Sequence, residues 1–405
     1  MPCDLEQGDI LDVTAPIRRL DHPNGRIWTF DPERIADPNR KSAPWVWDLI
    51  ASVQSIADAK RIADCWRYAS GQPQTGGDDF FPGTAAQQLA DYLFAAHLGG
   101  RSVSDVFRWC SNERDTSPAD ILSEYPRYAG IASRVSSVIA LTPETRSGVF
   151  GSLQTMVAFL ADPEIIDWID PHRDTNGNID ERRGLFDPYE FATSEDTLYL
   201  LSAQGRPSTA LTASLTAVVA FTAFQRAQSE FTGNNRRLPV PLCCVLDEAA
   251  NICRWPELAD VYSYFGSAGI PIMTIWQNPD QGKAAFGETN FGSLFNNANI
   301  TVYLGGIKDA KFLGEISQLV GQREIVRGSV NIDGTGRRSV NNSIQKENIL
   351  DVSDLTEWPV GRALLLASQS RAQIVKTLPW TGNRQWADAL TQAKAKARDE
   401  QRKAA

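Results

Sequence analysis

The sequence predicts an α/β protein that combines a parallel, doubly wound sheet with a separate all-helical region. From about Thr197 onward, short apolar runs alternate with longer segments of helical character, which is the pattern of successive βα units. Between about residues 45 and 165 the apolar residues recur at helical spacing instead. The 405 residues exceed the roughly 250–300 that one hydrophobic core organises. We therefore expect two domains, of which the larger is α/β.

The first 44 residues contain one strand signal. Residues 26–30 have strand character and stop at Asp31-Pro32. A single strand is too small to fold alone, so it should join a sheet formed later in the chain. Residues 45–165 predict an all-helical domain that packs on its own apolar faces. Its expected helices lie at 50–68, 84–98, 102–109, 131–141 and 145–160.

An α/β domain is expected over residues 166–380. Its predicted strands lie at 198–201, 242–246, 270–276, 299–304 and 361–367, with helices at 208–231, 256–265, 291–297 and 308–320. Two polar segments, 162–188 and the Gly- and Arg-rich 322–342, predict loops. Residues 381–405 predict a charged helix or tail.

Composition restricts the function classes. The net charge of -9 means that the surface as a whole does not attract nucleic acid, so any DNA contact must be local. Six cysteines without a C-x-x-C pair favour a reducing, cytoplasmic setting over a disulfide framework or zinc site. No apolar signal sequence follows Met1. Residues 208–224 are apolar but contain four Thr and two Ser, which favours a buried core helix over a membrane span of about 20 residues.

The strongest chemical signal is the acidic pair Asp247-Glu248, which follows the apolar run 242–246. Parallel strands deliver such side chains to the sheet edge at which ligands bind. In P-loop NTPases the strand-terminal Asp helps to hold Mg²⁺, and the next Glu is placed to polarise an attacking water. The alternative is that the acids cap a following helix or turn.

Gln277 follows the next predicted strand and should reach the same edge. A Gln at this place could orient the attacking water or sense a γ-phosphate. The alternative is an amide that satisfies loop backbone. The phosphate-binding motif G-x-x-x-x-G-K-[ST] occurs nowhere in the 405 residues.

These residues resemble the type IV coupling proteins, the TraG/TraD-like ATPases of conjugation and type IV secretion, and within them the TraM-recognition (TraG C-terminal) region. The resemblance rests on Cys243-Cys-Val-Leu-Asp-Glu-Ala-Ala-Asn251, Ile275-Trp-Gln-Asn-Pro-Asp-Gln281 and Phe295-Asn-Asn-Ala-Asn-Ile-Thr-Val-Tyr-Leu-Gly305. It is specific from about 240 to 321 and extends from about 26 to 380.

The resemblance implies a RecA-like P-loop NTPase sheet with an inserted all-α domain, assembled as a homo-hexamer at the cytoplasmic face of the membrane. It implies ATP and Mg²⁺ as cofactors, with Asp247 on Mg²⁺, Glu248 activating water and Gln277 as a sensor. DNA or relaxosome proteins and secretion-channel components are the implied partners. Family members also carry a membrane anchor and a Walker A ahead of the first segment seen here. We therefore expect an N-terminally truncated member, with residues 1–44 as a remnant of the nucleotide-binding domain.

Family members usually have arginines shortly before the Gln strand, and residues 264–270 contain none. Arg323 or Arg327 could serve instead as the arginine that acts across a subunit interface. Local DNA contact would fall on the same segment, which also contains Arg337 and Arg338.

Three functions remain open. The first is the C-terminal part of a coupling-protein ATPase, which we expect to lack ATPase activity as this chain alone. The second is a non-hydrolysing module that binds relaxosome, secretion or motor partners. The third is an unrelated α/β enzyme that uses Asp247 and Glu248 as acid and base.

Overall fold

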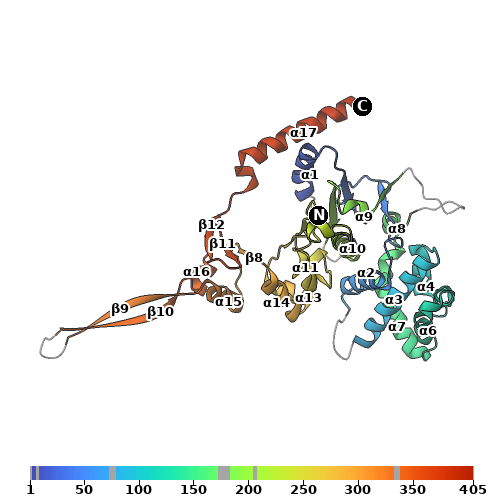
Figure 1. Ribbon diagram of the computed structural model, residues 1–405, viewed down its shortest axis with the longest axis horizontal. Coiled ribbons are helices and arrows are strands. Elements are labelled where there is room, and N and C mark those ends of the chain that lie inside the picture. Colours follow the sequence, from blue (N-terminus) through green and yellow to red (C-terminus); the bar gives the residue numbers. More distant parts are fainter. Residues whose placement is uncertain are drawn as a thin grey trace. The chain divides into compact units, whose positions relative to one another are not determined.

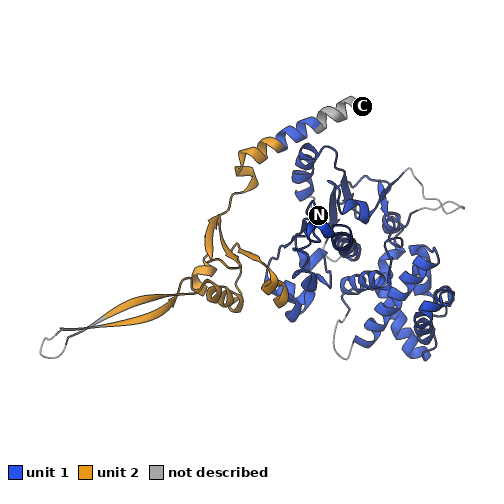
Figure 2. Ribbon diagram, in the orientation of Figure 1, with its two compact units in different colours: residues 1–291, 390–405 blue, residues 292–389 orange. Residues whose placement is uncertain are grey.

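The computed structural model describes residues 2–5, 9–72, 79–171, 183–203, 208–332 and 338–404 (Figure 1). The chain forms two compact units, one of residues 1–291 and 390–405 and one of residues 292–389 (Figure 2). We call them unit 1 and unit 2. The domain boundaries expected from the sequence, at 44/45, 165/166 and 380/381, stay predictions.

Unit 1 is built around a five-stranded sheet in which every pair of neighbouring strands is parallel. Its order is β2-β5-β1-β6-β7. The strands are β1 (Pro2–Leu5), β2 (Ile27–Phe30), β5 (Thr197–Ser202), β6 (Cys244–Leu246) and β7 (Ile272–Thr274). The prediction that the N-terminal strand joins a sheet formed later is confirmed, because β2 pairs with β5.

The N-terminal segment holds more structure than we predicted. Strand β1 lies in the middle of the sheet, and helix α1 (Asp9–Asp21) follows it. The helix was missed because it contains Pro16, and an internal proline usually ends a helix. The strand was missed because its four residues, Pro-Cys-Asp-Leu, show no apolar run.

Helix α10 (Ser208–Ser229) forms the core of unit 1. It contacts α2 (Ile56–Ala69), α9 (Pro188–Phe191), α11 (Ala249–Ile252) and β5. Among the described residues it is the one helix long and apolar enough to cross a membrane, and 78% of its most apolar window is buried inside the fold. Its Ser214 and Thr216 donate to the carbonyls four residues earlier, at 2.7 Å each. The helix is therefore packed as a core helix.

The helical part of unit 1 agrees closely with the predicted segments. Its helices are α2, α3 (Phe80–Leu98), α4 (Val103–Ser111), α5 (Ser117–Ser123), α6 (Ala129–Ile139), α7 (Pro143–Val157) and α8 (Pro163–Ile169). Helix α8 corrects the predicted loop at 162–188, because Asp162 caps it through the Glu164 N–H at 2.9 Å. The part of that loop at 172–182 lies outside the described residues.

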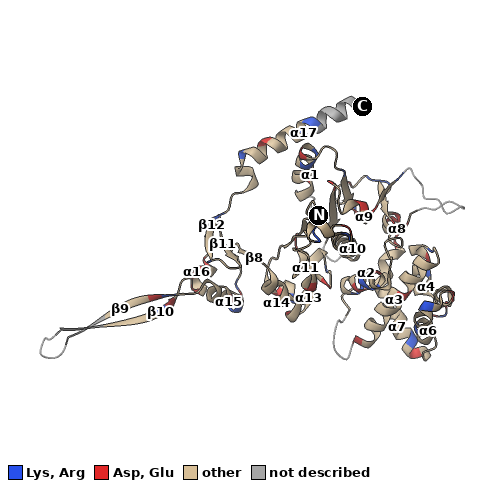
Figure 3. Cartoon of the chain, in the orientation of Figure 1, with Lys and Arg blue, Asp and Glu red and all other residues tan. Residues whose placement is uncertain are grey.

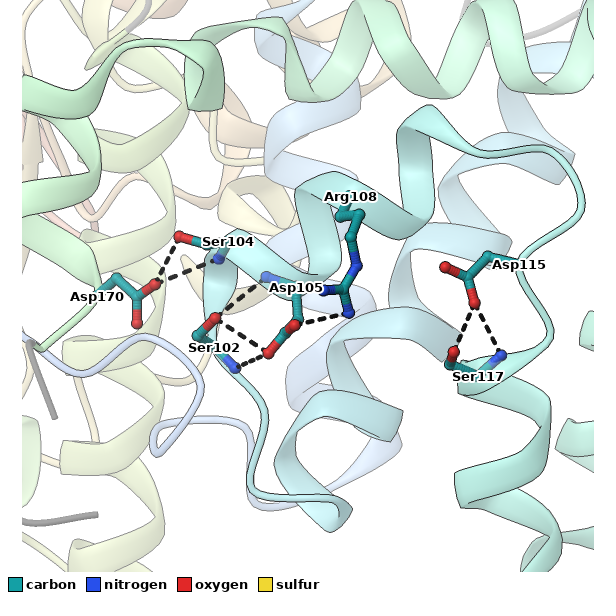
Figure 4. Close-up of polar contacts among 7 residues, drawn as sticks. All are labelled: Ser102, Ser104, Asp105, Arg108, Asp115, Ser117 and Asp170. Carbon is teal, nitrogen blue, oxygen red and sulfur yellow. Dashed lines mark hydrogen bonds and ion pairs between the residues drawn. The ribbon is translucent and has the colours of Figure 1, made fainter. Parts of the chain in front are cut away.

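Polar side chains at the helix starts fix how these helices begin (Figure 4). At α4, Ser102 and Asp105 form a capping box in which each accepts the other's backbone N–H at 3.1 Å. Asp170 accepts from the N–H and hydroxyl of Ser104, and Asp115 accepts from the same two groups of Ser117. Capping of this kind satisfies N–H groups that have no partner within the helix.

An aromatic cluster joins the helical part to the sheet. Trp28 and Phe30 of β2 meet Trp45 of β3 (Trp45–Trp47), Trp168 of α8 and Phe186 of β4 (Gly184–Phe186). Ring centroids lie 5.1–5.5 Å apart in T-shaped pairs, a geometry that adds to the energy of burial. Two further helices of unit 1 are α12 (Leu258–Val261) and α13 (Pro279–Phe286), whereas α14 (Glu288–Asn297) contains residues of both units.

Unit 2 has a separate antiparallel sheet of order β12-β11-β8. Its strands are β8 (Ile300–Tyr303), β11 (Arg362–Ala367) and β12 (Gln373–Lys376). The expectation that 299–304 and 361–367 extend the parallel sheet is therefore wrong. The link between β11 and β12 is too short for a parallel crossover. Helices α15 (Ala310–Val320) and α16 (Val352–Thr356) close its core over Tyr303 and Leu364.

The segment 322–342 forms strands, which corrects the predicted loop. Strand β9 (Gln322–Ile332) pairs antiparallel with β10 (Arg338–Asn348) over eleven residues of each strand. Its apolar residues recur at every second position near the tip, a period that favours strand. The last helix of the chain is α17 (Arg384–Ala404), where a charged helix or tail was expected.

Candidate functional site

The candidate site lies at the carboxyl ends of two neighbouring parallel strands of unit 1. Strands β6 and β7 pair Leu246 with Thr274. Asp247 and Glu248 directly follow β6, and Gln277 follows β7 by three residues. Strand β6 is shorter than predicted: it begins at Cys244, so Leu242 and Cys243 lie before it. The expected convergence of the two strand ends is nevertheless observed.

The Glu248 carboxylate is held on both oxygens. Gln277 donates from Nε2 to Oε1 at 2.6 Å. Asn251 donates from Nδ2 to Oε2 at 2.8 Å. Each carboxylate oxygen accepts more than one hydrogen bond, so both remain open to a further donor such as water.

The backbone of Glu248 lies in the left-handed region, with φ 47° and ψ 48°. This conformation is unfavourable for a residue with a Cβ, and such strain concentrates at functional sites. Glu248 stands at the start of α11, where its carbonyl accepts from the Asn251 N–H at 2.8 Å. The side chain of Glu248 makes no capping hydrogen bond. The alternative that this acid serves to cap the following helix is therefore not supported for Glu248.

Asp247 is partly buried beside a like charge. Burial and the neighbouring Glu248 carboxylate raise the pKa of Asp247, while the Glu248 N–H that donates to its Oδ1 at 3.1 Å lowers it. Among the described residues no ion pair joins a basic side chain to Asp247 or Glu248, and adjacent carboxylates of this kind favour the binding of a proton or a cation. The described residues contain no group of three or more His, Cys, Asp or Glu side chains that could hold a metal ion.

Sequence reasoning gave no role to Asn251 or Gln281, although both belong to the motifs quoted above. Asn251 lies three residues after Glu248 and reaches its carboxylate. Gln281, on α13, donates to the Gln277 side-chain oxygen at 3.5 Å. Asn251 and Gln281 lie three and four residues after Glu248 and Gln277. This spacing, at which side chains on a helix are neighbours, is the signal that could have identified them.

Strand β7 is the last strand of its sheet, and among the described residues no strand pairs with its outer edge. The backbone N–H and C=O groups of such an edge are groups that another strand can join. Met273 of β7 and Ile275, the residue directly after β7, are 56% and 42% exposed. Cys243, directly before β6, is also exposed.

The predicted arginines lie in the hairpin of unit 2. Arg323 and Arg327 are in β9, and Arg338 is the first residue of β10. Arg337 lies outside the described residues. Arg327 forms an ion pair with Glu347 across the hairpin. The structure therefore shows one cross-strand contact for Arg327, and its suggested role toward a nucleotide stays a prediction.

Residues 241–360 match the family described as the TraM recognition site of TraD and TraG. This match covers β6, β7, Asp247, Glu248 and Gln277 together with most of unit 2. No curated protein matches the chain.

Solved structures of one coupling protein share the fold. The chain is 15% identical to the unbound bacterial conjugative coupling protein TrwBdeltaN70. The match covers 93% of this chain and 84% of that chain, with a TM-score of 0.58. The plasmid coupling protein TrwB with the ATP analogue ADPNP gives 14% identity, 93% and 84% coverage and a TM-score of 0.57. TrwB with ADP and Mg²⁺ is 15% identical, with 93% of this chain and 84% of that chain covered and a TM-score of 0.56. The predicted fold, a RecA-like α/β sheet with an all-α part, is confirmed.

Proposed function

We propose that this chain supplies the carboxylate half of a nucleotide site, because it is TraG/TraD-like in sequence and has the fold of a conjugative coupling protein. The site would belong to a motor ATPase that recruits DNA, or protein, and pumps it into a conjugative or type IV secretion channel.

One observation supports this proposal above the others. The Glu248 carboxylate is held by Gln277 on one oxygen and by Asn251 on the other. This fixes its position at the sheet edge where α/β proteins bind ligands. Glu248 would accept a hydrogen bond from the attacking water and draw off its proton, and Gln277 would orient that water.

Asp247 is the residue proposed to hold Mg²⁺, and its surroundings fit. Mg²⁺ is usually bound through one or two carboxylates together with substrate phosphates. Asp247 supplies one such carboxylate, and the neighbouring Glu248 charge, which contributes to the raised pKa of Asp247, adds to the negative potential that attracts a cation. A bound Mg²⁺ would neutralise phosphate charge during transfer. TrwB has been solved with ADP and Mg²⁺, which supports the same pairing of cofactors here.

The 405 residues contain no G-x-x-x-x-G-K-[ST], so the proposal assigns the phosphate-binding loop to a segment outside them. The unpaired edge of β7 is where a strand that carries such a loop would join the sheet. Relaxosome proteins and secretion-channel components are the proposed partners, with a homo-hexamer at the cytoplasmic face of the membrane as the proposed assembly.

Binding of Mn²⁺, which takes the same oxygen ligands as Mg²⁺, tests the half-site without requiring turnover. We expect the full chain to bind Mn²⁺ weakly in an electron paramagnetic resonance titration. Asp247→Asn should weaken binding by about tenfold or more, since it removes the carboxylate that is proposed to hold the ion. Asp260→Asn, at an exposed acid on α12, is the matched control and should bind as the wild type does. Equal Mn²⁺ affinity of Asp247→Asn and wild type would contradict the assignment.

A second role is favoured by the same sequence match. The matched region is a TraM recognition site in TraD and TraG, and a chain without its own phosphate loop could bind partner proteins without hydrolysis. The two roles differ in one measurement. A TrwB-like strand and phosphate loop, fused ahead of residue 1, should restore ATP turnover if the first role holds. Turnover should stay absent, while partner binding persists, if the chain is an interaction module only.

A further inference from the structure

Three side chains beside the candidate site form a hydrogen-bonded group to which the proposed function gives no role. The hydroxyl of Thr274, the last residue of β7, lies 3.0 Å from the Tyr262 hydroxyl. The Trp276 indole N–H donates to the same Thr274 oxygen at 2.9 Å. A hydroxyl has one donor and two acceptor sites, so Thr274 can bond to both neighbours at once. We call Tyr262, Thr274 and Trp276 the Thr274 cluster.

Aromatic packing holds the Trp276 ring in this place. Phe286 of α13 and Phe291 of α14 lie 5.7 and 5.2 Å from it between ring centroids, at interplanar angles of 84° and 89°. T-shaped pairs of this kind add to the energy of burial. Gly282 of α13 leaves room for the Phe291 ring, because a Cβ at that position would clash with it. The indole is therefore held both on its ring and on its nitrogen.

The other end of the cluster is anchored in the core of unit 1. Tyr262 follows directly after α12, and its N–H donates to the Leu258 carbonyl at 3.1 Å. Leu258 and Val261 are fully buried. Burial raises the pKa of Tyr262, and hydrogen bonds with the side chain and backbone of Thr274 lower it. The contact between the two hydroxyls is therefore part of the packed structure.

The cluster lies where the sheet stops fixing the path of the chain. Strand β7 ends at Thr274, and the Ile275 N–H still donates to the Leu246 carbonyl of β6 at 3.0 Å. Trp276 and Gln277 lie beyond the strand. The Thr274 cluster thus supplies, after the end of β7, the support that strand pairing gives within it.

This support flanks Gln277, whose Nε2 donates to Glu248 Oε1 at 2.6 Å. On the other side of Gln277, Asn278 caps α13 by accepting the Gln281 N–H at 2.9 Å. An anchored residue therefore lies on each side of Gln277, although its own side chain is exposed. A functional side chain needs such support, because a small displacement removes the productive geometry.

The contacts of the Thr274 cluster are between uncharged groups. Helices α13 and α14, which hold the indole ring, are mostly uncharged (Figure 3). Their charged residues are Asp280, Lys283 and Glu288. Salt screens exposed charges far more than it affects buried packing, so the support beside Gln277 should persist at high ionic strength.

We propose that the members of the Thr274 cluster are positioning residues, which aim the Gln277 amide at the Glu248 carboxylate. The inference rests on the proposed function, in which these two groups orient and activate the attacking water. Thr274 is the centre of the cluster, because its oxygen bonds to both of the other members. The hydroxyl of Thr274, rather than its shape, is the feature that the position of Gln277 requires.

Side-chain amide NMR of the full chain, with isotope-labelled glutamine, measures the position of Gln277 without a nucleotide. Gln277→Met identifies the signals by their loss, and Glu248→Ala shows where they lie without the carboxylate. Thr274→Val removes the hydroxyl at nearly constant shape, and should move the signals most of the way toward those of Glu248→Ala. Thr274→Ser keeps the hydroxyl and should leave the signals near their wild-type position.

Thr29→Val is the matched control. Thr29 is half-buried in β2, another strand of the same sheet, so its loss of a hydroxyl should leave the Gln277 signals unchanged. Tyr262→Phe removes one bond to Thr274 and should move the signals in the same direction by less. It provides the test if circular dichroism shows that Thr274→Val does not fold.

The outcomes that overturn the proposal are distinct from those that concern the nucleotide site. Gln277 signals that do not move in Glu248→Ala, or that stay in place in Thr274→Val, would overturn it. Equal movement in Thr274→Val and Thr274→Ser, or in Thr29→Val, would do so as well, because the effect would then be one of general packing. A wild-type chain that binds no Mn²⁺ but shows the expected NMR pattern would count against the proposed nucleotide site and support the positioning of Gln277.

Discussion

The sheet edge at Glu248 and the hairpin at Val326 use charged residues in opposite ways. At the edge, the backbone of Glu248 is strained and two amide donors hold its carboxylate, with which no basic residue in the described part of the chain forms an ion pair. In the hairpin, the backbone is regular and Arg327 is neutralised by Glu347. The edge therefore has the features of a reactive site, and the hairpin those of a structural element.

The two regions also differ in what supports them. Leu246, directly before the acids, is fully buried in the sheet of unit 1. Val326 and Ile344 are mostly exposed. A functional site requires rigid support behind it, which the sheet of unit 1 provides and the exposed hairpin side chains lack.

The largest expected difference between the two regions is in stability. Leu246→Ala should lower the free energy of unfolding of unit 1 by about 2–5 kcal/mol, because it leaves a cavity in a packed core. Val326→Ala should change stability by about 0.5 kcal/mol or less, since the residue is exposed. Urea unfolding of the two variants measures both changes. A comparable loss in the two variants would show that the Val326 side chain is packed as closely as that of Leu246.

Backbone strain gives a second difference between the two regions. The glycine variant should be more stable than the alanine variant at Glu248 and less stable at Glu347. Glu248→Gly should be about 1 kcal/mol more stable than Glu248→Ala, because both lose the same side-chain bonds and only alanine is strained at positive φ. Glu347→Gly should be less stable than Glu347→Ala, because glycine weakens a strand interior. The same order at both positions in urea unfolding would refute the strained geometry of Glu248.

The site could be predicted better than the sheet around it. Polar residues that follow neighbouring parallel strands meet at one edge of the sheet, so the approach of Gln277 to Glu248 could be expected and is observed. The roles of Asp247, Glu248 and Gln277 toward a nucleotide stay predictions. Whether an apolar strand pairs in parallel or antiparallel is decided by its connections, which is why β8 and β11 were assigned to the wrong sheet. Segment 322–342 was taken for a loop because its Gly and Arg content obscured the alternation of Val326, Val330 and Ile332.

A smaller effect concerns pH. Because folding raises the pKa of Asp247, the folded state binds more protons than the unfolded state in the window above the ordinary aspartate pKa of about 3.9. Stability should therefore fall as pH rises through that window, and Asp247→Asn should remove this part of the fall. Glu248→Gln should reduce it, since the Glu248 charge is one of its causes. Urea unfolding at pH values from about 4 upward tests this, and an unchanged profile in Asp247→Asn would exclude the group.

The central claim is that the chain holds a carboxylate half-site without its phosphate loop. The most direct measurement is ATP turnover by the purified 405-residue chain with Mg²⁺, beside its Glu248→Gln variant. We predict that neither protein hydrolyses ATP above background. Turnover by the wild-type chain that disappears in Glu248→Gln would contradict the claim, because it would require a phosphate-binding site within these 405 residues.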